Sequence, residues 1–195
     1  MIKLILFDLN GVFITIEDEL FVEEFSKQYH LDKKKFQDVY DQFTIQAEYG
    51  KISSEEAWKK ILGYFKIKEN PKKMFQKAMR FKKEIPDMFA LLKRIKTKTA
   101  FITNYYPWAW EFINKKFSLE KRFDLGIVSF QIQSRKPEPK GFQIILKHFK
   151  VTPNEILFID DGIKNVDAAQ KLGMEAIHFQ NKEQLERELK RVKVL

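Results

Sequence analysis

The sequence contains no cysteine among its 195 residues. This absence excludes disulfide bonds, thiolate zinc sites and cysteine nucleophiles. The apolar runs stop well short of the ~20 residues that span a bilayer. No signal peptide is indicated either, because the first residues carry one lysine and then Asp8, with no small-residue cleavage site. Internal repeats, low-complexity tracts and free linkers are also missing. We therefore expect a globular cytoplasmic protein without membrane association.

Positive charge is unevenly distributed along the chain. The net charge is +9, from 36 Lys and Arg against 27 Asp and Glu, and residues 66–98 alone hold 12 basic and 3 acidic residues. Such a stretch can attract anions, including phosphates and nucleic acids. This one has no nucleic-acid motif and few interleaved aromatic residues. We interpret its lysines as a solvated helix face and surface loop, so a nucleic-acid partner is disfavoured.

The most informative part of the sequence is its beginning. A mostly aliphatic run, residues 2–7, leads directly into Asp8, and Gly11 follows three positions later. An apolar run without alternation is typical of a strand that is covered on both faces, as in a parallel α/β sheet. Ligands of such sheets bind just beyond the carboxyl ends of the strands. Asp8 is therefore placed to act as a nucleophile, a metal ligand or both.

A long segment of helical character follows this strand. Apolar residues recur at helical spacing over 18–30 and 32–49, Ser53 precedes acidic residues typical of a helix N-terminus, and Pro71 begins a further helix. The pattern predicts a four-helix insertion over residues 15–84.

Strand and helix patterns alternate over the rest of the chain. We predict strands over 99–103, 126–130, 155–161 and 174–179, and helices over 86–96, 107–117, 139–149 and 165–172 with a charged helix at the end. Repeated strand–helix units indicate a doubly wound, parallel α/β sheet. Residues 1–14 and 85–195 would form this core.

Polar side chains stand at the ends of four predicted strands. They are Asp8, Thr103, Lys136 before Pro137, and the pair Asp160 and Asp161. These ends share one edge of a doubly wound sheet, so the side chains can converge. Mg²⁺ is usually held by one or two carboxylates, with water and phosphate oxygens completing its shell. A hydroxyl and an ammonium would hold the remaining phosphate oxygens during phosphoryl transfer.

Four motifs, FDLNGV, FITN, SRKPEP and FIDDGIKNVDAA, follow one another in an order and at intervals that resemble those of the haloacid dehalogenase superfamily. The resemblance spans nearly the whole chain. It implies a Rossmann-like core and a Mg²⁺-dependent hydrolase that acts on a small phosphorylated metabolite through an aspartyl phosphate. The insertion is similar to the small α-helical cap of the phosphatase-like subgroup. The dehalogenase branch fits less well, because its members usually place Tyr at position 10 and lack paired acids in the fourth motif.

The resemblance assigns a metal site by position. Asp8 resembles the family nucleophile and first Mg²⁺ ligand. Asn10 occupies the place of the general acid/base aspartate, whose backbone carbonyl also binds the metal. Asp161 aligns with the metal-binding acid of the fourth motif, and Asp160 resembles its neighbour, a ligand or a supporting group. Asn165 lies where an acidic or amide residue often supports the metal shell.

The resemblance also assigns a phosphate site. Thr103 matches the phosphate-binding hydroxyl of the second motif, and Asn104 follows it as in many relatives. Lys136 matches the lysine that stabilises the nucleophile and the phosphate. Oligomeric state and the identity of the substrate have no counterpart in the sequence pattern.

Asn10 departs from the family pattern, because an amide can neither deliver a proton to the bridging oxygen nor take one from water. General acid–base help contributes ~10²–10⁴-fold to a reaction rate. Four explanations remain open: a preference for activated phosphates, a weak or retired enzyme, an asparagine introduced to trap a state, or deamidation at the Asn10–Gly11 pair. The alternative function is a non-catalytic protein of the same family that binds a ligand or a partner.

Overall fold

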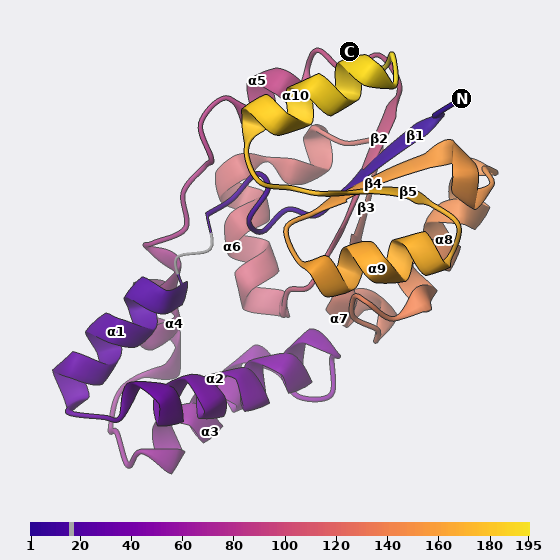
Figure 1. Ribbon diagram of the computed structural model, residues 1–195. Coiled ribbons are helices and arrows are strands. Elements are labelled where there is room, and N and C mark those ends of the chain that lie inside the picture. Colours follow the sequence, from indigo (N-terminus) through magenta and orange to yellow (C-terminus); the bar gives the residue numbers. More distant parts are fainter. Residues whose placement is uncertain (16–17) are drawn as a thin grey trace.

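A computed structural model describes residues 1–15 and 18–195. Residues 16–17, at the start of the predicted insertion, lie outside the described residues. Figure 1 shows two groups of elements, a sheet flanked by helices and a set of helices beyond one end of the strands. None of the described helices is long and apolar enough to cross a membrane.

The sheet has five strands that run parallel in the order β3-β2-β1-β4-β5. Their bounds are Leu4–Phe7 (β1), Lys98–Thr103 (β2), Leu125–Val128 (β3), Ile156–Asp160 (β4) and Glu175–His178 (β5). The strand that ends at Asp8 is therefore the central one, and β2 and β4 pair directly with it. This order brings the ends of the three central strands to one place at the edge of the sheet.

Helices cover both faces of the sheet (Figure 1). They are α5 (Met88–Leu92), α6 (Pro107–Phe117), α7 (Ser129–Ile132), α8 (Pro139–Phe149), α9 (Ile163–Lys171) and α10 (Lys182–Arg191), with short 3₁₀ turns at Leu119–Lys121 and Pro153–Glu155. Alternate residues of β1 face opposite layers: Leu4 and Leu6 pack in a cluster with residues of α8 and α9, and Ile5 and Phe7 pack with residues of α5, α6 and α10. Both faces of β1 are thus buried, as the continuous apolar run predicts.

The insertion contains four helices, α1 (Asp18–Tyr29), α2 (Lys33–Glu48), α3 (Ser54–Tyr64) and α4 (Pro71–Met79). Three of them begin at side chains that accept a hydrogen bond from a backbone N–H in the first turn: Asp32 before α2, Ser53 before α3 and Asn70 before α4. Aromatic residues fill the interior of this group, and Trp58 is completely buried. We refer to α1–α4 as the helical insertion.

Two chain segments connect the helical insertion to the sheet and pair with each other. Ile14 and Glu84 form an antiparallel bridge, and the Ile85 N–H donates to the Phe13 carbonyl at 2.8 Å. The segments that leave and re-enter the core therefore form one short ladder. Residues just beyond this ladder lie at the junction between the insertion and the sheet.

Most predicted elements differ from the observed ones by a few residues at an end, and two of these differences have a visible cause. The predicted strand 126–130 ends at Val128, because the Ser129 hydroxyl donates to the Tyr105 carbonyl and accepts from the Tyr105 N–H, both at 3.1 Å, and the chain turns into α7. The predicted helix 86–96 is reduced to Met88–Leu92, because Asp87 adopts a left-handed φ of 60° at its start. Both differences lie at element ends, where local sequence signals are weakest.

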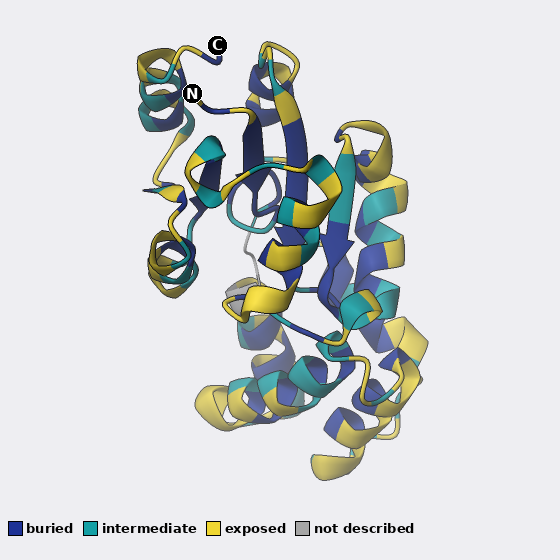
Figure 2. Cartoon of the chain, turned by 90° about the vertical axis from the view of Figure 1, so that its right-hand side faces the viewer, coloured by how far each residue is buried: buried dark blue, intermediate teal, exposed yellow. Residues whose placement is uncertain are grey.

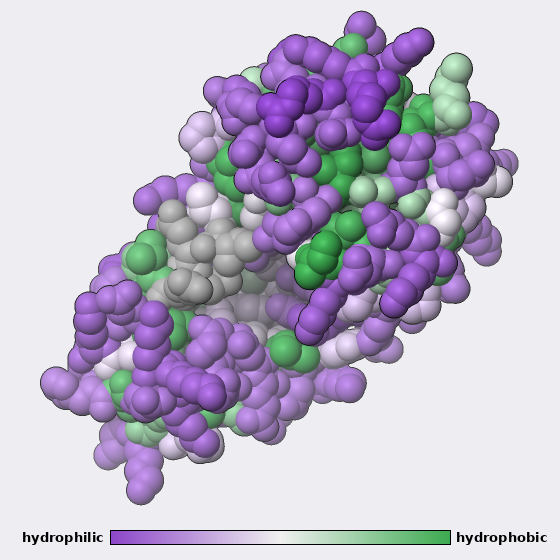
Figure 3. Space-filling view, in the orientation of Figure 1, coloured by the Kyte–Doolittle hydropathy of each residue, from purple (hydrophilic) through white to green (hydrophobic). Residues whose placement is uncertain are grey.

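The face of the molecule in Figure 3 is mostly hydrophilic. Buried residues lie in the interior of both groups of elements (Figure 2), and most of them are apolar. Within the basic stretch 66–98, every lysine and arginine is exposed except Lys77 and Lys82. The interpretation of this stretch as solvated surface is therefore wrong for Lys82, whose relative exposure is 2%.

Candidate functional site

Three carboxylates converge at the carboxyl ends of β1 and β4. Asp8 directly follows β1, and its N–H continues the ladder by donating to the Ile159 carbonyl at 2.8 Å. Asp160 is the last residue of β4, and Asp161 follows it. One oxygen from each of the three side chains lies within 4.8 Å of the others. The predicted convergence of Asp8, Asp160 and Asp161 is therefore present in the fold.

Lys136 enters this group of acids from the loop before α8. Its Nζ lies 2.8 Å from Asp8 Oδ1 and 2.5 Å from Asp160 Oδ2, and 1% of its side chain is exposed. One ammonium thus faces three carboxylates in a buried setting. The group keeps an excess of negative charge, which suits a site for a divalent cation.

The two consecutive aspartates differ in their surroundings. Asp160 is fully buried, and its Oδ1 accepts from the Gly162 N–H at 2.7 Å and from Asn165 Nδ2 at 2.9 Å. Its Oδ2 is bonded to Lys136. Asp161 is half-buried and lines the same cavity as Asp8, whereas Asp160 lies behind that cavity.

Burial and charge shift the titration of this cluster. Burial raises the pKa of Asp8 to about 7, against the attraction of Lys136, and the charges of Asp160 and Asp161 add to the rise. Burial, with a smaller contribution from Asp160, also raises the pKa of Asp161. Burial alone would lower the pKa of Lys136, but the attraction of Asp8 and Asp160 outweighs it and raises that pKa. The ammonium is therefore retained, and in the absence of a cation Asp8 and Asp161 hold a proton more readily than ordinary carboxyl groups.

Thr103, the last residue of β2, contributes a buried hydroxyl to the cavity. Its Oγ1 has no hydrogen-bond partner among the described residues. A buried polar atom without a partner is costly in a folded protein and calls for an explanation. A phosphate oxygen in the adjacent cavity would supply the missing partner.

Asn104 holds the loop that carries Lys136. Its Oδ1 accepts from the Lys136 N–H at 2.9 Å, and its Nδ2 donates to the Lys136 carbonyl at 3.2 Å. Both ends of the amide are thus bonded to the backbone of a single residue. Asn104 also lines the cavity, but the contacts that the structure gives its side chain serve to position Lys136.

Two adjoining cavities meet at this end of the sheet. The smaller, of about 200 Å³, is lined by Asp8, Thr103, Lys136 and Asp161 among others. The larger, of about 280 Å³, lies between α2 and the core. Four residues line both cavities: Asn10, Glu48, Asn104 and Arg135. A ligand that extends from one cavity into the other would pass these four.

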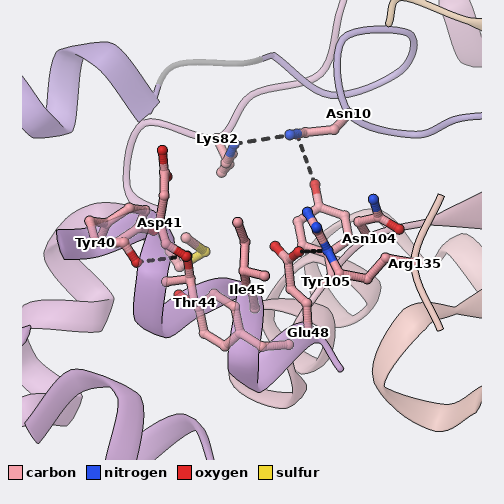
Figure 4. Close-up of a pocket in the computed structure, with 13 residues that line it drawn as sticks. Asn10, Tyr40, Asp41, Thr44, Ile45, Glu48, Lys82, Asn104, Tyr105 and Arg135 are labelled. Carbon is pink, nitrogen blue, oxygen red and sulfur yellow. Dashed lines mark hydrogen bonds and ion pairs between the residues drawn. The ribbon is translucent and has the colours of Figure 1, made fainter. Parts of the chain in front are cut away.

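Glu48 and Arg135 join the helical insertion to the core (Figure 4). Arg135 Nε donates to Glu48 Oε2 at 2.6 Å, and the two side chains are 23% and 16% exposed. Neighbouring residues extend the contact, because the Tyr49 hydroxyl bonds to Glu138 and the Arg135 guanidinium lies over the Tyr49 ring. The end of α2 is therefore fixed against the loop that presents Lys136.

Asn10 lies where the larger cavity meets the smaller one (Figure 4). Its Oδ1 accepts two hydrogen bonds, from the Tyr105 hydroxyl at 2.9 Å and from Lys82 Nζ at 3.3 Å. Tyr105 follows β2, and Lys82 follows α4. The amide oxygen is thus held by one residue of the core and one at the end of the insertion.

The sequence analysis did not identify four residues of this region: Glu48, Lys82, Tyr105 and Arg135. Arg135 and Tyr105 stand next to predicted site residues, so proximity was an available signal. Glu48 and Lys82 had no such signal, because only the packing of the insertion brings them to the core. Lys82 in particular was one of twelve basic residues in a stretch with no feature to distinguish it.

Comparisons with known proteins agree with this architecture. The family model described as haloacid dehalogenase-like hydrolase matches residues 2–173. A D-ribitol-5-phosphate phosphatase from Bacteroides thetaiotaomicron is 30% identical over 193 residues, and the match covers 93% of each chain. A haloacid dehalogenase family enzyme from that bacterium has a structure with a TM-score of 0.81 at 26% identity, covering 95% of this chain and 98% of the other. Its wild-type complex with magnesium and inorganic phosphate gives a TM-score of 0.77 at 26% identity, covering 95% and 99%. Motif order, sheet topology and full-length similarity lead to the same conclusion: this chain belongs to the haloacid dehalogenase-like hydrolases, in the phosphatase-like part of that superfamily.

Proposed function

We propose that the protein is a Mg²⁺-dependent phosphatase that hydrolyses small phosphate monoesters through a phosphorylated Asp8. The observation that carries this proposal is the content of the smaller cavity. The carboxylates of Asp8 and Asp161, the ammonium of Lys136 and the Thr103 hydroxyl, which has no partner among the described residues, line about 200 Å³. Acceptors for a cation and donors for an anion thus face one small space.

The donor set fits Mg²⁺, which prefers hard oxygen ligands and few protein carboxylates. Asp8 and Asp161 would bind it, together with the Asn10 backbone carbonyl that the family resemblance assigns. When bound, the ion would neutralise charge on the phosphoryl group. Asp160 has hydrogen bonds to Lys136, Gly162 and Asn165 on its two oxygens, so its role would be to orient Lys136. Asp160 also does not line the cavity that Asp8 and Asp161 share.

The reaction would begin with attack of an Asp8 carboxylate oxygen on phosphorus. Lys136 and the Thr103 hydroxyl would hold the phosphate oxygens, and Asn104 would keep Lys136 in place. The bond from phosphorus to the substrate oxygen then breaks, and the alcohol leaves through the larger cavity. Attack of water on the phosphorylated Asp8 would release inorganic phosphate. Positioning and electrostatic stabilisation supply most of the acceleration in phosphoryl transfer.

The larger cavity supports a polar substrate. Its wall from α2 carries Tyr40, Asp41 and Thr44, and its opposite wall carries Asn104 and Tyr105. Side chains of this kind match hydroxyl groups better than an apolar chain. A relative over the full length acts, by its name, on D-ribitol 5-phosphate. We therefore infer a phosphorylated polyol or sugar as the substrate class.

The helical insertion would act as the cap of the site, with residues 15–84 as the cap and residues 1–14 and 85–195 as the core. The Glu48–Arg135 contact at 2.6 Å would hold it over the cavities. A closed cap excludes water from the phosphoryl group during transfer.

The rival function is ligand binding without turnover, and Asn10 is the observation that favours it. Its side chain cannot carry a proton between the substrate and water. An enzyme with this residue would need another source of stabilisation for the leaving group, or a substrate that needs none.

An activity screen with Mg²⁺ separates the two functions. Aryl, acyl and sugar phosphates are tested with wild type, with Asp8→Asn, and with Asp167→Asn as a control that removes an exposed acid of α9. The phosphatase predicts turnover by wild type and by the control, and none by Asp8→Asn. Asn10→Asp should raise turnover of alkyl esters more than that of activated ones. If neither wild type nor Asn10→Asp turned over any of the substrates, the result would contradict the enzyme function.

A further inference from the structure

We propose that Lys82 is a catalytic residue that stabilises negative charge on the leaving-group oxygen, in place of the proton donor that Asn10 cannot be. This inference rests on the phosphatase function proposed above. It assigns a buried cation of the helical insertion to the reaction, and it predicts which substrates depend on it.

The position of the scissile bond follows from the two cavities. The phosphoryl group belongs in the smaller cavity, with Asp8, Thr103 and Lys136. The organic part of a substrate would extend into the adjoining larger cavity, which is lined by side chains of α2 and the core. The oxygen that joins them must therefore lie at the junction, where Asn10 is one of four residues shared by both cavities.

Lys82 lies at this junction. Its Nζ is 3.3 Å from Asn10 Oδ1, and Lys82 itself lines the larger cavity (Figure 4). With the Tyr105 hydroxyl on the same oxygen at 2.9 Å, the Asn10 carbonyl already accepts two donors. The Asn10 amide can then offer a leaving group only its N–H bonds, and Lys82 is the cation that contacts the Asn10 side chain.

The placement of Lys82 is fixed from the core as well as from the insertion. The ammonium of Lys116, on α6, donates to the Lys82 carbonyl at 2.7 Å, and Lys82 Nζ lies 3.4 Å from the Thr15 carbonyl. Lys82 also stands two residues before Glu84, which pairs with Ile14 in the connecting ladder. Its charge should thus remain at the junction even when α2 moves.

A cation at this point acts when the bond from phosphorus to the leaving oxygen breaks. The electron pair of that bond stays on the oxygen, which becomes an alkoxide, and water supplies the proton that completes the alcohol. The Lys82 ammonium would hold the developing charge by electrostatic attraction and by donating a hydrogen bond. Preorganised donors of this kind contribute ~10²–10³-fold in other enzymes. An aryl leaving group delocalises its own charge and should gain much less.

The test compares two classes of substrate at one pH and saturating Mg²⁺. Lys82→Met keeps the length of the side chain and removes the charge. We expect kcat/KM for ribitol 5-phosphate to fall ~10²-fold and that for 4-nitrophenyl phosphate to fall less than ~5-fold. Lys83→Met is the matched control, because Lys83 is the adjacent residue and is exposed. It should leave both rates within twofold of wild type.

Equal losses on both substrates, or no loss on either, would overturn the assignment. A packing defect is recognised separately by the melting temperature. A measurement on wild type alone tests the proposal even if the variant does not fold. Across a series of aryl and alkyl phosphates, the kcat/KM of wild type should depend only weakly on the pKa of the leaving alcohol. A steep dependence in wild type would contradict a stabilising charge. Absence of any turnover in wild type would instead refute the phosphatase function itself.

Discussion

Replacement of Lys136 by methionine tests the electrostatic balance on which the site depends. The Lys136 ammonium contacts Asp8 at 2.8 Å and Asp160 at 2.5 Å, and the three side chains are 1%, 9% and 0% exposed. Methionine has nearly the same length, so the substitution removes charge more than volume. It leaves two buried carboxylates facing each other without the cation between them.

The expected loss of stability follows from the burial of this ion pair. Removal of one partner of a buried ion pair costs about 3–5 kcal/mol in free energy of unfolding, because the remaining charge is neither solvated nor compensated. For a chain of this size each kcal/mol lowers the melting temperature by roughly 2–4 °C. We therefore expect Lys136→Met to melt about 6–20 °C below wild type in metal-free buffer at pH 7.5.

The assay is thermal unfolding followed by circular dichroism in EDTA and in Mg²⁺. The deficit should shrink at pH 5.5, because protonation of Asp8 relieves its repulsion with Asp160. It should also shrink in Mg²⁺, which replaces part of the lost positive charge. Lys98→Met is the control: Lys98 pairs with Asp124 at 2.7 Å, but its side chain is 64% exposed. That exposed pair should contribute less than about 1 kcal/mol. Equal melting of Lys136→Met and wild type without Mg²⁺ would refute this reasoning.

Three further predictions follow from the same geometry. Asp161→Asn should weaken Mg²⁺ binding at least tenfold in isothermal titration while changing the melting temperature of the metal-free protein little, since Asp161 is half-buried and lines the cavity; unchanged affinity would remove Asp161 from the metal site. Because burial raises the pKa of Asp8 to about 7, the metal-free carboxyl binds a proton that the unfolded chain, with a pKa of 3.8, has lost. This group should therefore make the metal-free protein less stable as the pH rises from about 4 to 7. For the same reason Mg²⁺ binding should release a proton near neutral pH and weaken below pH 7; binding that is independent of pH between 6 and 8 would argue against it. Finally, a double-mutant cycle of Glu48→Gln and Arg135→Met should give a coupling free energy of about 1–2 kcal/mol in unfolding, between the values for exposed and buried pairs. Additive effects of the two substitutions would mean that this ion pair does not hold α2 to the core.

The site shows where sequence reasoning succeeds. Asp8, Thr103 and Asp160 each end an apolar strand, and a parallel sheet necessarily brings such ends to one edge. The pattern of apolar residues therefore predicted both the strands and the meeting of their polar ends. Element boundaries were less accurate, as β3 shows, because the Ser129 side chain that ends it bonds to the distant residue Tyr105.

The assignment of Asn104 marks a limit of this reasoning. Its place after Thr103 predicts phosphate binding, which stays a prediction, but the bonds of its amide to the backbone of Lys136 at 2.9 and 3.2 Å were not predictable from the sequence. The direction of a side chain depends on what surrounds it in three dimensions, and adjacency in sequence carries no information about that.

The sequence by itself determined the α/β fold, the helical insertion and the meeting of Asp8 with Thr103, Asp160 and Asp161, because these depend on hydrophobic periodicity and on strand ends, which are local properties. Lys136 was expected at a strand end as well, but it lies in the loop between α7 and α8. Only the tertiary structure decided which residues of the insertion reach the site. Glu48 and Lys82 lie 38 and 72 positions after Asn10 in the chain, and they meet the core through the packing of α1–α4. Of the twelve basic residues in 66–98, Lys82 is the buried one, and its burial could not be read from the local sequence because its contacts come from segments far away in the chain.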